Sequence, residues 1–401
     1  MGGDFTSASA SGKGMQTICE PNGAKLDIVC TIFDPNRGGP VERARSVYER
    51  MKFMGHRAEI VFPDAEGSAA PYVAAAGIPF TKLPIRKPVL PNKPWLFLRY
   101  IFGLPFAIGR VRNFLQARRP SVVHVNGAFD VVPALGAFFA GIPLVWHLND
   151  TVFSARLSRW LGRIVNALAS EIPVAATKVG QHYGISVERS TLLPAPVDTT
   201  RFTDRDPSYL PGKSPRLGLV GNWNWVKQQD HFVEVLSRLR QNGLDAHGTI
   251  IGGFIPGQEA FYEPILERIE RDALGDVIEA EGFCEDVSAE IARFDIALLT
   301  SRSEACPMCV LEAMSVGVPV VAYDVGGTAE ILGEGEDAAG VVISAGDKEA
   351  MVDTVAMLLR DQNAYRRMAR NGQARAREKF SLEACVARHI EIYKKAIGTP
   401  S

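Results

Sequence analysis

The chain carries one pattern twice: short apolar runs, typical of buried strands, alternate with longer segments of helical periodicity. In the first half these runs predict strands at 26–33, 58–62, 121–125, 144–147 and 174–176. In the second half they predict strands at 216–220, 246–251, 277–280, 294–299 and 319–323. Strands that alternate with helices in this way indicate parallel sheets with helices on both faces.

The alternation is interrupted once, by the segment 194–215, which holds five prolines and several turn residues. This favours an α/β protein of two Rossmann-like, doubly wound lobes, over 25–200 and 216–380, joined by a linker at 201–215. A last helix, 381–401, is expected to cross back to the first lobe. The cleft between the lobes, at the carboxyl ends of both sheets, is the expected ligand site.

Composition excludes several other classes of protein. Hydrophobic residues make up 46% and charged residues 22% of 401 residues, which suits two or three globular domains. A net charge of −1 argues against nucleic-acid binding. Six cysteines are too few for a disulfide scaffold, so a cytoplasmic location is expected. Residues 1–24 lack the apolar core of a secretory signal and are interpreted as a flexible leader, and no membrane-spanning segment is predicted.

Two acidic residues flank a predicted helix start. Glu304 lies in a loop after a buried strand, and Glu312 lies eight positions later, in the first turns of a helix. The free backbone N–H groups around 309–311 form a natural phosphate pocket. Carboxylates beside such a pocket accept hydrogen bonds from sugar hydroxyls, and a nucleotide-sugar carries both groups. The plain alternative is a solvated loop acid and a helix-start acid favoured by the dipole.

The order of motifs around these acids is more specific than their spacing. Glu304, Glu312-Ala-Met, Gly317-Val-Pro-Val-Val and Gly326-Gly327-Thr-Ala-Glu330 closely resemble glycosyltransferase family 4, retaining enzymes of the GT-B fold. The resemblance implies a glycosyltransferase that moves a sugar from a UDP- or GDP-linked donor to an acceptor hydroxyl. Its acceptor is expected to be a lipid-linked or polysaccharide-precursor glycan. No cofactor and no metal are implied beyond the donor substrate.

The resemblance extends to the other strand ends. Gly38 and Gly39 match the family's first glycine loop, where a Cβ would block close approach of the ligand. His147 matches a histidine that contacts the donor sugar, and Lys227 a lysine that binds the diphosphate. A structural histidine and a surface lysine are the plain alternatives. The expected catalytic residues are His147, Lys227 and Glu304; the donor-binding residues are Gly38, Gly39, Gly221, Asn222, Lys227, Phe283, Arg302, Glu304, Pro307, Met308, Cys309, Val310 and Glu312; the acceptor-side residues are Asn126 and Asn149.

The chain departs from the family pattern at several positions. Asn222 stands where the family usually has arginine, which weakens leaving-group stabilisation, and Arg302 is a hypothetical replacement. Asn126 stands where histidine is often seen, and Ala305 replaces a frequent glycine. Cys306-Pro-Met-Cys309 lacks a second pair at zinc spacing. A nucleotide-sugar epimerase of the same fold and a non-catalytic nucleotide-sugar-binding protein remain as alternatives.

Residues 82–119 form a basic segment with interleaved aromatic residues and no acid. Such a segment suits peripheral contact with the anionic inner face of a membrane. An amphipathic helix that packs on the first lobe and exposes a solvated basic face is the second interpretation, and nucleic-acid binding has no supporting motif.

Overall fold

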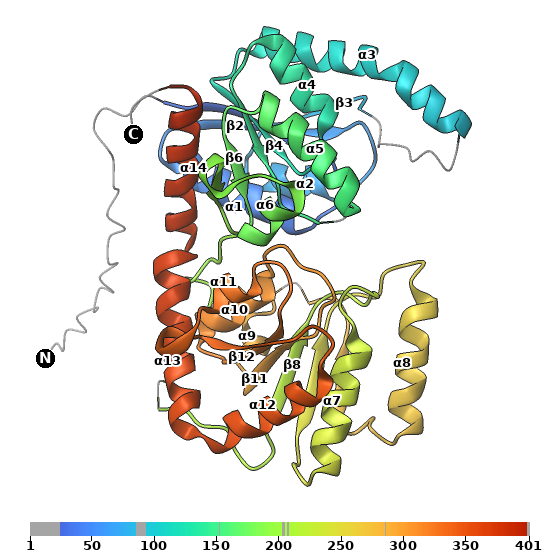
Figure 1. The fold of residues 1–401 in the computed structure, drawn as a ribbon, viewed down its shortest axis with the longest axis vertical. Coiled ribbons are helices and arrows are strands. Elements are labelled where there is room, and N and C mark those ends of the chain that lie inside the picture. The colour runs from blue at the N-terminus through green and yellow to red at the C-terminus, as the bar shows by residue number, and fades with distance from the viewer. Residues whose placement is uncertain are drawn as a thin grey trace, which may run out of the picture.

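The computed structural model describes residues 25–85, 94–151, 153–202, 205–206, 208–284 and 286–398. The expected leader over 1–24 lies outside these ranges. The described chain forms two α/β lobes, one above the other along the long axis of the molecule, with a long helical segment along one side of both (Figure 1).

The first lobe is built on a five-stranded parallel sheet with the order β3-β2-β1-β4-β5. Its strands are β1 (Asp27–Ile32), β2 (Arg57–Pro63), β3 (Phe80–Leu83), β4 (Val122–Asn126) and β5 (Leu144–His147). A short parallel pair, β6 (Ile172–Val174) and β7 (Ser190–Leu192), continues beside β5 through isolated bridges. The helices are α1 (Gly39–Phe53), α2 (Ala69–Ala75), α3 (Pro94–Arg118), α4 (Val131–Ala140), α5 (Ala155–Leu168), α6 (Thr177–Tyr183) and η1 (Val187–Arg189).

The second lobe is built on a six-stranded parallel sheet with the order β10-β9-β8-β11-β12-β13. Its strands are β8 (Arg216–Val220), β9 (His247–Ile251), β10 (Ile278–Glu281), β11 (Ile296–Leu299), β12 (Val320–Tyr323) and β13 (Gly340–Ile343). The helices are α7 (Gln229–Gln241), α8 (Glu259–Arg271), α9 (Ser288–Ile291), α10 (Met308–Val316), α11 (Thr328–Leu332), η2 (Gly335–Asp337), α12 (Lys348–Arg360), α13 (Gln362–Lys379) and α14 (Leu382–Ala396).

The strand order explains where a ligand can bind. Helices cover both faces of each sheet, so central strands such as β1 are buried along their whole length and read as continuous apolar runs. The order reverses between β1 and β4 in the first sheet, and between β8 and β11 in the second. The loops after these four strands diverge at that point and leave a crevice. The predicted architecture, two doubly wound parallel-sheet domains, is confirmed.

The end of the chain connects the two lobes. Helix α13 packs against α10 in the second lobe, whereas α14 packs against α1 in the first (Figure 1). Cys385, Val386 and Ile392 of α14 join the apolar core of the first lobe. The hydroxyl of Tyr393 lies 2.6 Å from His124 Nδ1 and 2.9 Å from the hydroxyl of Tyr48. The last helix therefore belongs to the first lobe by packing, although it follows the second in sequence.

Some predicted elements differ from the observed ones. Strand β6 occupies 172–174 rather than 174–176, because Val174 is its last paired residue and 175–176 lead into α6. Strands β3, β7 and β13 were not predicted. The residues of β3 and β7 are exposed or half-buried, which explains their weak apolar signal, and β13 has only four residues, two of them buried. Within the described residues, no helix combines the length and apolar character that a membrane crossing requires.

Candidate functional site between the lobes

The starts of α1 and α10 meet where the two lobes face each other. A Cβ placed on Gly39, the first residue of α1, would lie 3.9 Å from Sδ of Met308, the first residue of α10. Neither helix start is capped by a side-chain hydrogen bond. The first N–H groups of a helix lack intrahelical acceptors, and the helix dipole adds positive potential there. Two anion-binding helix ends, one from each lobe, thus face one small region.

Lys227 and Glu304 form an ion pair between two loops of the second lobe. Lys227 follows β8 and Glu304 follows β11, and the Lys227 ammonium donates to Glu304 Oε1 at 2.7 Å. Burial alone would lower the pKa of Lys227. The negative charge of Glu304 is the largest opposing effect, and the net result is a pKa of Lys227 raised to about 12. Gly326 packs directly against the loop that carries Glu304. A Cβ at Gly326 would lie 1.8 Å from the Glu304 carbonyl oxygen, so a larger residue would clash with this loop. The two predicted donor ligands therefore occupy one site.

Glu312 lies on α10, one turn beyond the helix start, and its carboxyl group is largely buried. Burial raises its pKa to about 7, the Arg201 charge opposes the shift, and the Glu42 charge adds to it. Glu42 belongs to the first turn of α1 in the other lobe. Glu312 is therefore a carboxyl group at the lobe interface that changes its charge near neutral pH.

His147, at the end of β5, has no exposed surface. Its Nε2 lies 3.2 Å from Arg43 Nη1, and its ring stacks on His124 with centroids 5.6 Å apart. Burial lowers the pKa of His147 well below its usual value, so the ring is neutral. Protein atoms cover the ring in this structure, and the contact between His147 and a donor sugar stays a prediction.

Arg43 of α1 is a site residue that the sequence analysis did not identify. Its side chain is buried, with 5% of the residue exposed, and it donates to Asn126 Oδ1. The same oxygen accepts a hydrogen bond from Asn149 Nδ2 at 2.6 Å. Arg43 thus contacts His147 and Asn126 directly, and it is linked to Asn149 through the shared Asn126 oxygen. Among the residues that the structure describes, it has no carboxylate within ion-pair distance. The sequence signal was an arginine one turn after Gly39, on the apolar face of the helix.

The remaining predicted residues lie around this centre. Asn222 Oδ1 accepts a hydrogen bond from the Gly253 N–H at 3.0 Å, so its side chain supports the neighbouring loop. The Arg302 guanidinium lies 5.7 Å from the centre of the Trp225 ring, beside the Lys227 loop. Pro307, Met308, Cys309 and Val310 form the start of α10, Gly38 precedes α1, Gly221 follows β8, and Phe283 is 68% exposed after β10.

Cys306 and Cys309, beside the start of α10, are surrounded by protein atoms. Cys306 Sγ accepts a hydrogen bond from the Ala195 N–H at 3.2 Å, and burial raises the pKa of the Cys306 and Cys309 thiols to about 12. Across the described ranges, no three His, Cys, Asp or Glu side chains are grouped as a metal site would require.

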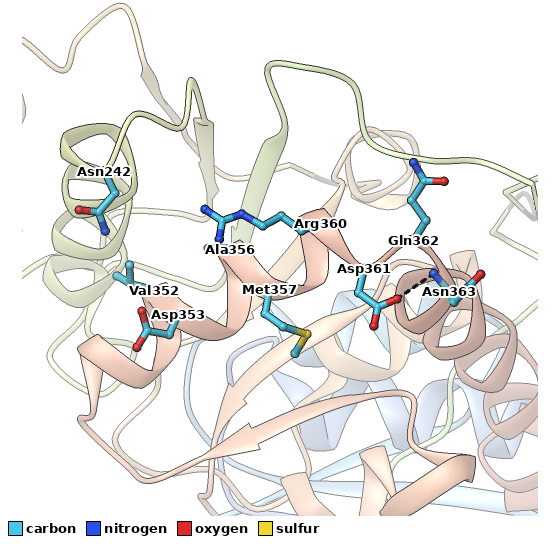
Figure 2. A pocket seen from close by; sticks show the side chains of 9 residues that line it. All are labelled: Asn242, Val352, Asp353, Ala356, Met357, Arg360, Asp361, Gln362 and Asn363. Carbon is cyan, nitrogen blue, oxygen red and sulfur yellow. Dashed lines mark hydrogen bonds between the residues drawn. The ribbon is translucent and has the colours of Figure 1, made fainter.

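A separate cavity of about 870 Å³ lies at the far end of the second lobe, between the end of α7 and the junction of α12 and α13. Figure 2 shows its lining side chains, which are Asn242, Val352, Asp353, Ala356, Met357, Arg360, Asp361, Gln362 and Asn363. It contains none of the predicted site residues, and it lies far from the two helix starts.

Two family models match the chain, one in each lobe. A model described as "Glycosyl transferase 4-like domain" matches residues 38–179, and one described as "Glycosyl transferases group 1" matches residues 200–375. These ranges include the starts of both α1 and α10. The chain therefore belongs to the GT4-type glycosyltransferases, as the sequence resemblance predicted.

Particular relatives agree with this class. The chain is 31% identical over 202 residues to the lipopolysaccharide core biosynthesis mannosyltransferase LpsB of Rhizobium meliloti, covering 48% of this chain and 57% of that protein. It is 24% identical to an MMP alpha-(1->4)-mannosyltransferase of Mycolicibacterium hassiacum, covering 60% of this chain and 59% of that protein. The matched segments thus span somewhat more than half of these two relatives.

Solved structures share the whole architecture. Anabaena HepE in complex with UDP matches with a TM-score of 0.76 at 18% identity, covering 91% of this chain and 99% of that chain. A glycosyltransferase from Rickettsia africae matches with a TM-score of 0.78 at 16% identity, covering 94% and 100%. At this identity the likeness establishes the GT-B fold.

Proposed function

We propose that this protein is a retaining glycosyltransferase that moves a sugar from a UDP- or GDP-linked donor to an acceptor hydroxyl. One observation carries the proposal: the uncapped starts of α1 and α10 face each other beside the Lys227–Glu304 pair. Two helix ends and an ammonium suit a diphosphate, and the adjoining carboxylates suit sugar hydroxyls. The HepE complex with UDP and the two mannosyltransferase relatives support the donor class.

In the proposed reaction, Lys227 and the start of α10 stabilise the diphosphate as the bond between the sugar and the phosphate breaks. The acceptor hydroxyl attacks from the face that the phosphate leaves, and the departing phosphate oxygen takes the hydroxyl proton. The anomeric configuration is therefore retained without a covalent intermediate. Glu304 holds donor sugar hydroxyls, Glu312 holds the ribose, and Asn126 and Asn149 lie on the acceptor side. The proposal includes no resident metal ion, since protein groups supply the positive charge.

The proposal is tested by incubating the protein with UDP- and GDP-sugars and measuring nucleoside diphosphate release, with and without an acceptor extract. Glycosylated product with the donor's anomeric configuration, lost in Lys227→Met, is the expected result. Donor conversion to an isomeric nucleotide-sugar without an acceptor would favour the epimerase alternative. Tight nucleotide-sugar binding without any turnover would favour the non-catalytic alternative.

We propose further that the acceptor is a lipid-linked or polysaccharide-precursor glycan, reached at an anionic membrane surface through α3. The first half of this helix exposes Trp95, Phe102 and Phe106, each by more than 70%. Arg99, Arg110 and Arg112 are exposed on the same helix, which carries no acid. Aromatic rings at headgroup level with nearby arginines suit an anionic bilayer interface. The cytoplasmic face of a membrane is the location this proposal implies.

Not all of the basic segment belongs to this surface. Arg118, at the end of α3, forms ion pairs with Asp27 at 2.7 Å and with Glu59 at 2.8 Å and packs on the lobe. Residues 86–93 lie outside the described ranges. Flotation with vesicles of anionic and of neutral lipid tests the proposal. We expect recovery with anionic vesicles at low salt, lost in Trp95→Ser/Phe102→Ser/Phe106→Ser, and equal recovery with both lipids would contradict it.

A further inference from the structure

A column of alternating cations and aromatic rings crosses from the first lobe to the second. The Arg45 guanidinium lies 4.4 Å from the centre of the Tyr72 ring, and the Arg37 guanidinium lies 4.1 Å from that ring. Arg37 also faces the ring of Phe283 in the other lobe, at 6.0 Å. The contacts within the first lobe are close, whereas the one across the cleft is wider.

The first-lobe part of the column is held by several bonds. Glu42, in the first turn of α1, accepts from Arg37 Nε with one oxygen and from the Tyr72 hydroxyl with the other, at 2.5 Å. Arg45 Nη1 donates to the Tyr72 hydroxyl at 2.6 Å. The Arg37 backbone N–H donates to Ser68 Oγ at 3.0 Å, which ties its loop to the start of α2. These contacts fix the position of the Arg37 guanidinium.

The column borders the nucleoside end of the proposed donor site. Glu42, which holds Arg37, is close enough to Glu312 for its charge to raise the pKa of that carboxyl group. Glu312 is the proposed ribose ligand. Phe283 follows β10, next to the Asn222–Gly253 contact, and the residue is 68% exposed. The ring is linked to the proposed ribose ligand through Arg37 and Glu42, and its exposed face is open to a planar base.

We propose that the nucleobase of the donor stacks between Phe283 and Arg37, so that the first lobe takes part in base binding. The inference rests on the proposed function. Two stacking contacts of roughly 3.5 Å each need about 7 Å between the two planes. The Arg37 guanidinium carbon lies 6.0 Å from the centre of the Phe283 ring, somewhat less than that width, so the two lobes must separate slightly when a base enters. Guanidinium groups stack on planar π-systems, whereas an ammonium does not match that geometry.

Calorimetric titration of the full chain with UDP, GDP and inorganic pyrophosphate tests the inference. Arg37→Ala is expected to weaken the better-bound nucleotide about fivefold to thirtyfold and to leave pyrophosphate unchanged. Arg37→Lys keeps the charge but loses the planar group, so it should resemble Arg37→Ala. Phe283→Ala should weaken the nucleotide as well, and the double variant should lose less than the two single losses combined. Arg50→Ala, on the last turn of α1, the helix that follows Arg37 in the chain, is the matched control and should bind like the wild type.

The outcomes separate this inference from the proposed function. Arg37→Lys with wild-type nucleotide affinity, or Arg37→Ala with unchanged affinity, would overturn the stacking role while leaving the glycosyltransferase proposal intact. Equal weakening of pyrophosphate and nucleotide would show that Arg37 binds phosphate instead, and would also overturn it. If the wild type binds neither nucleotide, the proposed function fails together with the inference.

Discussion

The Lys227 ammonium is bound to Glu304 at 2.7 Å, so the cation proposed for the diphosphate is paired with the carboxylate proposed for the sugar. In the proposed function, the donor phosphates compete with Glu304 for this ammonium, and the carboxylate becomes free to accept from the sugar hydroxyls. The pair therefore keeps both side chains in place before the donor arrives.

This relationship predicts opposite effects on binding and on turnover. In Glu304→Gln, the negative charge that pairs with Lys227 and repels phosphate is removed. We expect a severalfold tighter Kd for UDP or GDP by calorimetry, together with a loss of transfer of about a hundredfold or more, since a carboxylate bond to the reacting sugar is lost. Glu290→Gln, which alters an exposed pair with Arg293, should change neither. Weaker nucleotide binding in Glu304→Gln would contradict this view of the pair.

Alanine substitutions at Gly39 and Gly326 are predicted to have contrasting effects on stability. Among the described residues beyond its chain neighbours and its own helix backbone, the nearest atom to a Cβ at Gly39 is Met308 Sδ at 3.9 Å, so Gly39→Ala should fold with an unchanged Tm. A diphosphate against the α1 start has no room for that methyl group, so donor affinity should fall about tenfold or more. Gly326, with φ +53° and a Cβ position 1.8 Å from the Glu304 carbonyl oxygen, is the structural counterpart. Gly326→Ala should lower the Tm, and a similar loss of Tm in Gly39→Ala would contradict the distinction.

Glu312 predicts a pH-dependent stability. Its pKa is about 7 in the folded protein and near 4.5 when exposed, so the unfolded chain loses this proton first. Stability should therefore fall as pH rises from about 4.5 to 7, and the penalty should persist above pH 7. Glu312→Gln removes that penalty and should raise the Tm relative to wild type at pH 8 but not at pH 4.5. An equal shift in Tm at both pH values would show that the titration of Glu312 is not responsible.

Arg43 predicts a trade-off between stability and activity. Its buried charge has neutral partners in Asn126 and His147, and burial of such a charge is costly. Arg43→Met keeps the volume and removes the charge, so the Tm should stay equal or rise. Turnover should fall, because Asn126, Asn149 and His147 lose the group that gathers them. A lower Tm together with wild-type turnover would assign Arg43 a purely structural role.

Much of the fold follows from local pattern. Strands β5 and β8 and helix α13 have the boundaries that periodicity predicts, because they are buried runs or helices between clear stop signals. Strand β3 was missed because its residues 80–83 lie at a sheet edge and alternate between exposed and half-buried positions. Its pairing with β2 depends on the rest of the sheet rather than on its own sequence.

The site residues likewise fall into two groups, those that a local sequence motif predicts and those that it does not. Glu304, Glu312 and Lys227 belong to ordered motifs at strand ends, so sequence alone locates them. Arg43 occupies a buried position on α1, where arginine is not expected. Arg37 and Tyr72 were not predicted, because they lie in a loop and a helix that meet each other and the predicted Phe283 only in the folded chain. Residues that act through such long-range contacts carry no local signal.

Titration of wild type and Lys227→Met with UDP and GDP is the most direct measurement of the central claim, which is that a nucleoside diphosphate binds between the starts of α1 and α10. Methionine fills much of the space of lysine without its charge. We predict saturable binding of one of the two nucleotides to the wild type and a loss of about tenfold or more in Lys227→Met, equivalent to about 1.4 kcal/mol or more. Equal affinity in both proteins, or no binding of either nucleotide to the wild type, would contradict it.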